Sequence, residues 1–136
     1  MTTGTAGTTA RDFGKQMVHY LRKTITFANR GAAVTVGTIP AGSVIVTSMS
    51  GIVVTTAFNG SGTDVLDVGY STDSGTNNLA TLVDIAALGF KPLDEAVADQ
   101  LVSSDVTIQA LYTDQNSNAS AGSGEIVICY IPDNDG

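Results

Sequence analysis

Short segments rich in valine, isoleucine and threonine recur along this chain, and glycine, asparagine, serine or proline stands between them. Residues 43–58, 64–70, 106–112 and 125–131 are the clearest examples. Such segments favour β-strands, and the residues between them favour turns. We therefore expect an all-β fold, a two-sheet antiparallel sandwich with seven or eight strands and at most one or two short helical segments. A jelly roll is the topology that suits this pattern best.

The first half of the chain gives four local predictions. Alternating residues 24–27 predict a first strand, and residues 33–37 a second one that ends in a tight turn at residues 39–42. Residues 43–58 are too long for one ordinary strand. Because Gly51 lies in their middle, we expect a kinked long strand that serves two sheets.

The second half is less regular. Residues 59–62 predict a hairpin-type break, followed by a strand at residues 64–70. Apolar residues at i, i+3, i+4 and i+7 from Leu79 to Ala86 predict a short helix, with Gly89 as its stop. Residues 90–104 fit either a loop or a helical turn, residues 106–112 alternate as a strand, and residues 114–124 predict a surface loop.

The last predicted strand, residues 125–131, has no polar alternation after Glu125. Both of its faces should therefore lose water, which is unusual in an antiparallel sheet. The second sheet would cover one face, and the first strand or another subunit would cover the other. We expect Ile126, Ile128 and Tyr130, or the side chains on the opposite face of the same strand, to form an oligomer interface.

Charge is distributed unevenly along the 136 residues. The net charge is +4 over residues 1–30 and −11 over the remainder, for −7 overall. Such asymmetry indicates an electrostatically steered partner rather than chemistry in a pocket. We expect a flexible arm at residues 1–14, a single β-sandwich domain at residues 15–136, and attachment charges at the five basic residues that precede Gly31: Arg11, Lys15, Arg22, Lys23 and Arg30.

Several classes of protein are disfavoured by composition. No apolar stretch reaches twenty residues, so no membrane partner is expected. The first ten residues do not resemble a signal peptide, so we expect synthesis in the cytoplasm. The single cysteine, Cys129, allows neither an intramolecular disulfide nor a cysteine-based zinc site. The acidic pI, about 4.2, argues against direct binding of nucleic acid.

No catalytic constellation is found. His19 is the single histidine, and no nucleophile motif accompanies it, so we expect no enzyme activity and no cofactor. Carboxylates at Asp64, Asp67 and Asp73 do not have EF-hand spacing, and a solvated acidic surface is the simpler interpretation. The same holds for three further carboxylates, Asp94, Glu95 and Asp99, and a hydrolase that uses His19, Asp94 and Asp99 is the third-ranked hypothesis. No bound metal is expected.

Four stretches carry a resemblance to a known family: VTVGTIPAGSVI, VVTTAFNGSGTDVLDVG, NLATLVDIAALG and GSGEIVICYI. Together they span roughly residues 24–132, and this region resembles the capsid decoration, or cement, proteins of tailed bacteriophages. The resemblance implies a jelly-roll-like β-sandwich that forms dimers or trimers on the outside of the head and contacts the major capsid protein. It implies a structural virion protein that bridges neighbouring capsid subunits. The alternative is a receptor- or glycan-binding β-sandwich with acidic loops around Asp73 and Asn116.

Overall fold

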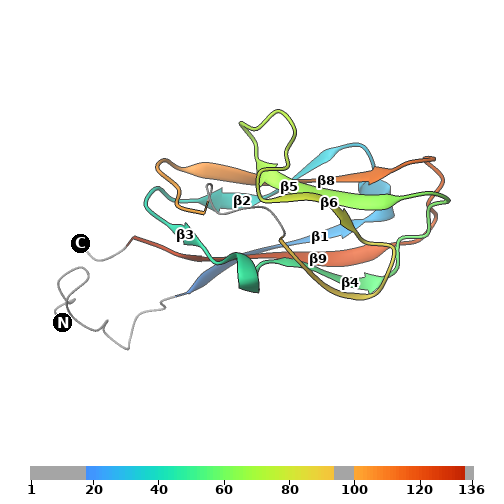
Figure 1. The fold of residues 1–136 in the computed structure, drawn as a ribbon, viewed down its shortest axis with the longest axis horizontal. Helices are drawn as coiled ribbons and strands as arrows, with labels where there is room; N and C mark the ends of the chain where they lie inside the picture. Colours follow the sequence, from blue (N-terminus) through green and yellow to red (C-terminus); the bar gives the residue numbers. More distant parts are fainter. Residues whose placement is uncertain (1–17, 94–99, 134–136) are drawn as a thin grey trace.

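The computed structural model describes residues 18–93 and 100–133, which fold into two antiparallel β-sheets that face each other (Figure 1). Sheet A contains, in spatial order, β1 (His19–Thr26), β9 (Ser123–Ile131), β4 (Gly51–Thr56) and β7 (Gly89–Pro92), and the short β3 (Val44–Ile45) also pairs with β9. Sheet B contains β2 (Ala33–Ile39), β8 (Val106–Asp114), β5 (Asp64–Tyr70) and β6 (Ala80–Asp84). The prediction of an all-β two-sheet sandwich is confirmed.

The strand order is that of a jelly roll. β3 and β4 can be counted as one interrupted strand, because both pair with β9. The first strand then pairs with the last (β1 with β9), the second with the last but one (β2 with β8), and so on through β4 with β7 to β5 with β6. All these pairs are antiparallel, so the chain is one long hairpin rolled up into two sheets, which is the arrangement of a jelly roll.

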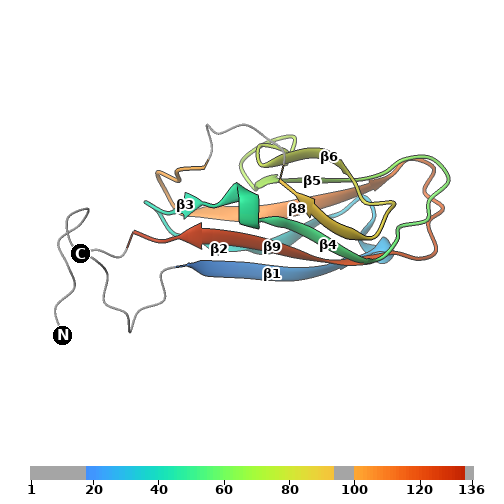
Figure 2. The same cartoon turned by 60° about the horizontal axis from the view of Figure 1, so that its bottom comes forward.

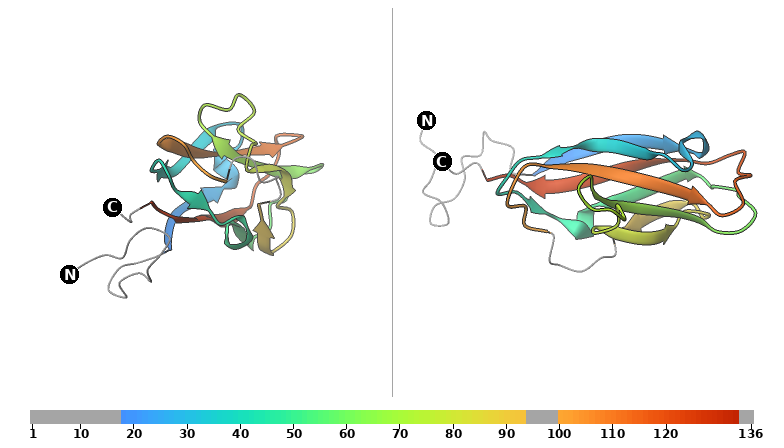
Figure 3. Two further views of the ribbon diagram at one scale, coloured as in Figure 1. Left: turned by 60° about the vertical axis from the view of Figure 1, so that its left-hand side comes forward. Right: turned by 90° about the horizontal axis from the view of Figure 1, so that it is seen from above.

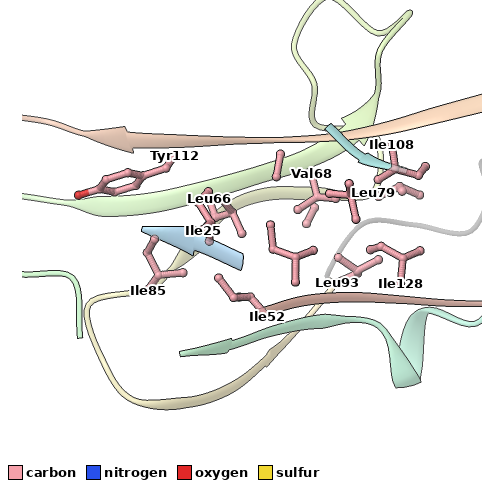
Figure 4. Close-up of a cluster of buried hydrophobic side chains, with 14 of the residues drawn as sticks. Ile25, Ile52, Leu66, Val68, Leu79, Ile85, Leu93, Ile108, Tyr112 and Ile128 are labelled. Carbon is pink, nitrogen blue, oxygen red and sulfur yellow. The ribbon is translucent and has the colours of Figure 1, made fainter. Parts of the chain in front are cut away.

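Apolar side chains from both sheets fill the space between them (Figure 4). Along β4, β8 and β9 the buried apolar residues follow the two-residue period of a strand. Fully buried members are Ile25, Ile52, Ile126 and Ile128 from sheet A and Leu66, Val68, Ile108 and Tyr112 from sheet B. Since burying one such side chain contributes about 1.5–3 kcal/mol, this core is the main source of stability.

The segment 43–58 is kinked, as expected, but it does not serve two sheets. A 3₁₀ turn, η2 (Thr47–Met49), interrupts it, and both flanking strands remain beside β9. The Ser50 hydroxyl donates to the Val46 carbonyl at 2.8 Å and accepts from the Cys129 N–H at 2.9 Å. This side chain therefore replaces the ladder hydrogen bonds that the kink removes, and it keeps the segment in one sheet.

The helix expected from Leu79 to Ala86 is wrong. These residues contain β6, which pairs with β5 through a register shift: Val83 lies opposite Leu66, and Ala80 lies opposite Val68. One extra residue in β6 is thus bulged out, and Leu82, at φ 51°, points to solvent. The bulge sets the inward residues three apart, and so gives a strand the spacing of a helix.

Two other expectations need correction. β7 lies in the stretch that was expected to be a loop or a helical turn, and Gly89 begins this strand instead of ending a helix. The expected surface loop 114–124 is partly internal, because Asp114, Ala119 and Gly122 are buried. Residues 1–14, the predicted arm, lie outside the described residues. Within the described ranges no helix is long and apolar enough to cross a membrane.

One end of the sandwich is formed by three connections, η1 (Phe27–Asn29) and the loops 57–63 and 115–122, and we call it the loop end. It lies opposite the end at which β1 begins and β9 finishes (Figures 1 and 3). Backbone hydrogen bonds join its parts, from the Phe27 N–H to the Gly122 carbonyl and from the Asn59 N–H to the Ala121 carbonyl. The loops thus close this end of the core.

Candidate functional site

The predicted attachment charges do not form one cluster. Arg11 and Lys15 lie outside the described residues. Arg22 and Lys23 follow each other on β1, an edge strand of sheet A, and both are exposed. Arg22 lies 3.5 Å from Glu125 Oε2, and the other carboxylate oxygen, Oε1, accepts a 2.6 Å hydrogen bond from the Thr24 hydroxyl. An exposed ion pair of this kind contributes little to stability, so Arg22 can exchange its partner at small cost.

Arg30 has a different environment, because it lies at the loop end beside a buried carboxylate. Its guanidinium donates to Asp114 Oδ2 at 3.1 Å, and the Asp114 side chain is fully inaccessible. The same carboxylate accepts from the Ala119 N–H at 2.7 Å and from the Asn116 N–H at 3.2 Å. Arg30 therefore has a partner within the fold, while its expected attachment role stays a prediction.

A second buried carboxylate adjoins the first. Asp64 lies directly opposite Asp114 in the β5–β8 pair, and both point into the sandwich. The Tyr112 hydroxyl donates to Asp64 Oδ1 at 2.6 Å, while the buried Oδ2 has no hydrogen-bond partner among the described residues. The expected solvated acidic surface is thus wrong for Asp64. It is also wrong for Asp67, which is largely buried on the opposite face and accepts from the Leu82 N–H.

The positions of Asp64 and Asp114 in the alternating patterns of their strands could have predicted that both side chains point inward. Asp64 continues the inward series of Leu66 and Val68, and Asp114 continues that of Ala110 and Tyr112. Polar groups of the neighbouring loops form hydrogen bonds with one another in the same region. Ser61 accepts at its hydroxyl from the Asn118 side chain at 2.6 Å, and Thr63 donates from its N–H to the Gln115 side chain at 3.1 Å. The loop end is therefore a connected polar network over a closed core.

Hydrogen bonding determines the charge of Asp114. The Ala119 N–H is the main cause that lowers its pKa below the ordinary value; burial opposes this effect, and Arg30 reinforces it. For Tyr112, burial and then the hydrogen bond to Asp64 raise the pKa above the usual range for a tyrosine. Tyr112 thus stays protonated and donates, while Asp114 stays ionised and accepts.

The lowered pKa of Asp114 predicts an acid-labile loop end. A carboxylate whose folded pKa lies below its unfolded value, about 3.9, contributes stability that is present above that value and is lost as the pH falls through the folded pKa. We expect the melting temperature of the wild-type chain to fall between pH 5 and pH 2. The Asp114→Asn variant, which has no charge to lose there, should be less stable at pH 5 and should fall less over the same interval. Equal slopes for the two proteins would contradict this role of Asp114.

The predicted oligomer residues lie inside the sandwich. Ile126 and Ile128 are fully buried in the core, and Tyr130 is 9% exposed and packs with them. Side chains in this position are not available to a partner. The opposite face of β9, which was the alternative, contains Val127, Cys129 and Ile131 and points away from the core.

This opposite face belongs to a larger surface, the outward side of sheet A, which we call the outer face (Figure 2). Directly paired residues of antiparallel strands point to the same side, so the strand registers define its members. Five of its apolar side chains are well exposed: Tyr20 at 58%, Phe90 at 48%, Val44 and Ile131 at 41% each, and Val53 at 38%. Its members include Tyr20, Arg22, Thr24, Val44, Val53, Thr55, Phe90, Pro92, Glu125, Val127, Cys129 and Ile131.

The outward side of sheet B is different in character. Its members are mostly polar, and the loop after β5 covers part of it. The side that a Cβ on Gly69 would occupy is filled by the backbone of Thr76 and Asn77 and by the Asn78 side chain. The polar members are Thr35, Thr38, Asp67, Asp84, Thr107, Gln109 and Thr113. One sheet of the sandwich therefore has an ordinary solvated face, and the other has an apolar one.

The remaining candidates for chemistry are engaged or undescribed. His19 packs against Tyr130 with ring centroids 5.6 Å apart. Asp73, one of the residues proposed for glycan binding, accepts from the Asn77 N–H at 2.8 Å. Asp94, Glu95 and Asp99 lie outside the described residues. Across residues 18–93 and 100–133, no three histidine, cysteine or acidic side chains come together as a metal site.

Comparisons with known proteins give one kind of match. No protein-family model matches the chain, and no curated protein does. Among solved structures, a chain in the acidic stable capsid structure of Helicobacter pylori bacteriophage KHP30 superposes with a TM-score of 0.64 at 17% identity, over 85% of this chain and 88% of that chain. A chain of the cyanophage Pam1 capsid asymmetric unit has a TM-score of 0.64 at 15% identity, over 96% and 97%. The sandwich is a fold found in phage capsids. At this level of identity the likeness establishes the fold, which is the fold that the sequence resemblance implied.

Proposed function

We propose that this chain is a structural virion protein that binds the outside of a phage head and bridges neighbouring major capsid protein subunits as a homo-oligomer. The observation that supports it most is the near full-length likeness to chains from two phage capsid structures. The family resemblance of residues 24–132 points in the same direction. Bridging raises the cost of separating subunits, and many weak copies on a shell act together.

The side chains favour a contact protein over an enzyme. The single histidine packs on Tyr130, and the buried carboxylates Asp64 and Asp114 are held by Tyr112 and Arg30 inside a closed core. Exposed basic groups remain available for attachment at Lys23 and, by exchange of its ion pair, at Arg22. Together with Arg11, Lys15 and the partly exposed Arg30, they form the proposed capsid-binding set.

Shell binding tests this proposal directly. Deleting residues 1–23 would remove half of β1 and disturb the fold, so point substitutions are preferable. We expect the Arg11→Gln, Lys15→Gln, Lys23→Gln triple variant to bind phage shells that lack the chain about tenfold more weakly, since three exposed ion pairs contribute about 0.5 kcal/mol each. Cosedimentation of shells with the labelled chain measures this effect.

A matched control separates attachment from general charge. The Thr35→Glu, Thr38→Glu, Thr113→Glu variant changes the net charge by the same amount on the outward side of sheet B, where all three residues are exposed. This variant should bind shells like the wild-type chain. If both variants bound shells equally weakly, the change in net charge alone would explain the effect, and the proposed set of basic attachment residues would be contradicted. A wild-type chain that does not bind shells at all would overturn the proposed function.

A further inference from the structure

The outer face of sheet A is the largest feature that the core and the loop end do not use. Its rows of paired side chains run across the sheet, with Tyr20 beside Cys129, Arg22 beside Val127, and Val53 between Glu125 and Phe90. A monomeric protein seldom exposes several large apolar side chains on one flat face, and an antiparallel sheet normally presents polar residues to water. This face therefore has the character of an interface.

We propose that the outer face of sheet A docks onto the same face of a second copy of this chain, so that two sandwiches pack sheet to sheet. This deepens the proposed homo-oligomer by naming its contact surface, and it does not depend on attachment to a capsid. In such a two-fold arrangement each residue meets the same set of residues on the other copy. The test is therefore made in solution without shells.

Charge favours a second copy over a strongly charged partner. Arg22 and Glu125 are the charged residues of the outer face, and they pair with each other, so the face is neutral. The whole chain has a net charge of −7. Two acidic copies repel each other through their other surfaces, and the neutral face is where they can approach at least cost. A two-fold contact also allows Arg22 of one copy to pair with Glu125 of the other.

Geometry and size are also suitable. Two sheets with the same twist pack face to face about 10 Å apart with their strands at about 30° to each other. Four strands about 4.8 Å apart, with about seven residues each at about 3.4 Å, give a projected area of about 450 Å² per copy. Side-chain relief increases the accessible area beyond this value, toward the roughly 800 Å² per partner of a standard interface. We therefore expect a specific but modest dimer.

Sedimentation velocity over a concentration series tests the pairing. The full wild-type chain should pass from monomer to dimer as its concentration rises. Tyr20→Lys and Phe90→Lys each place an unpaired charge in the contact and should raise the dimer dissociation constant at least about tenfold. Thr113→Lys adds the same charge on the exposed outward side of sheet B and should leave the dissociation constant unchanged.

A second measurement remains informative if a lysine variant does not fold. In a Cys129→Ser background, a maleimide should label Tyr20→Cys several-fold more slowly at dimer concentrations than at monomer concentrations, and Thr113→Cys at equal rates. A chain that is monomeric at every concentration, a trimer, or a dimer that survives both lysine substitutions would each overturn the proposal. Any of these results leaves the shell-binding test untouched, so the two proposals can fail separately.

Discussion

Replacing Phe58 with alanine is expected to lower the free energy of unfolding by about 4 kcal/mol, the loss typical of a large aromatic side chain removed from a core. Phe58 is 2% exposed at the loop end, and its ring lies 4.8 Å from the ring of Tyr112 at an angle of 60°. Gly122 packs on the other side so closely that a Cβ there would overlap the Phe58 ring. Little room exists for neighbouring groups to collapse into the cavity.

Urea unfolding followed by circular dichroism measures this loss as a fall in the midpoint with an unchanged slope. Phe90→Ala is the matched control, because it makes the same chemical change at a side chain that is 48% exposed. At monomer concentrations it should cost less than about 0.5 kcal/mol. A Phe58→Ala variant no less stable than Phe90→Ala would show that the loop end does not close the core.

The Phe58 ring also supports the carboxylate pair. Tyr112 donates its hydroxyl to Asp64 while its ring packs on Phe58, so the aromatic contact holds the donor in place. Losing Phe58 would let water reach Asp64, whose Oδ2 is buried without a partner among the described residues. We therefore expect Phe58→Ala and Asp114→Asn to be non-additive, because both act on one connected network.

The sequence predicted the class of fold well because strand periodicity is a local property. Residues 106–112 alternate as a strand requires, and residues 64–70 were expected as a strand although their apolar residues are out of strict phase. The bounds of the two segments agree with β5 and with most of β8. The turn residues between strands were equally visible, since Asn, Gly and Pro favour turns for local conformational reasons. Local periodicity does not predict which strands pair when they are distant in sequence. The jelly roll was therefore predicted from the number of strands and from the family resemblance.

The errors have local physical causes. The bulge in β6 gives this strand the apolar spacing of a helix. The hydrogen bonds of Ser50 keep both parts of the kinked segment 43–58 in one sheet, whereas a kink was expected to lead the chain into the second sheet. The inward and outward sides of β9 could not be told apart, because both are apolar, so the oligomer interface was expected either at Ile126, Ile128 and Tyr130, which lie in the core, or on the opposite face of the strand. The ion pair of Arg30 could not be predicted, because its partner, Asp114, lies 84 residues away.

Gly51 marks a close approach of two backbones, which the sequence alone could not distinguish from a bend. A Cβ at this position would overlap the carbonyl of Lys91, on the neighbouring strand β7. Because a backbone atom cannot rotate away as a side chain can, Gly51→Ala must push β7 from β4. We expect a loss of about 3 kcal/mol in the free energy of unfolding, at the upper end of the cost of overpacking.

Hydrogen exchange should locate the damage in β7. This strand has four residues, and among the described strands it pairs with β4 alone, so its amides should lose protection before those of β9. Gly31→Ala is the control. Gly31 has φ 74° but open space around a Cβ. Alanine there should lower the free energy of unfolding only by the cost of a left-handed backbone, about 1–2 kcal/mol. A Gly51→Ala variant as stable as Gly31→Ala would contradict the close approach.

The same substitution links the fold to the proposed interface. Phe90 lies on β7 opposite Val53, so displacing β7 removes an apolar member from the outer face. We expect Gly51→Ala to weaken self-association as Phe90→Lys does, while shell attachment through Lys23 on the far edge strand β1 is retained. Sedimentation velocity at a temperature where the variant is folded measures the first effect, and cosedimentation with shells measures the second. Full self-association in a variant whose β7 amides exchange freely would exclude Phe90 from the contact.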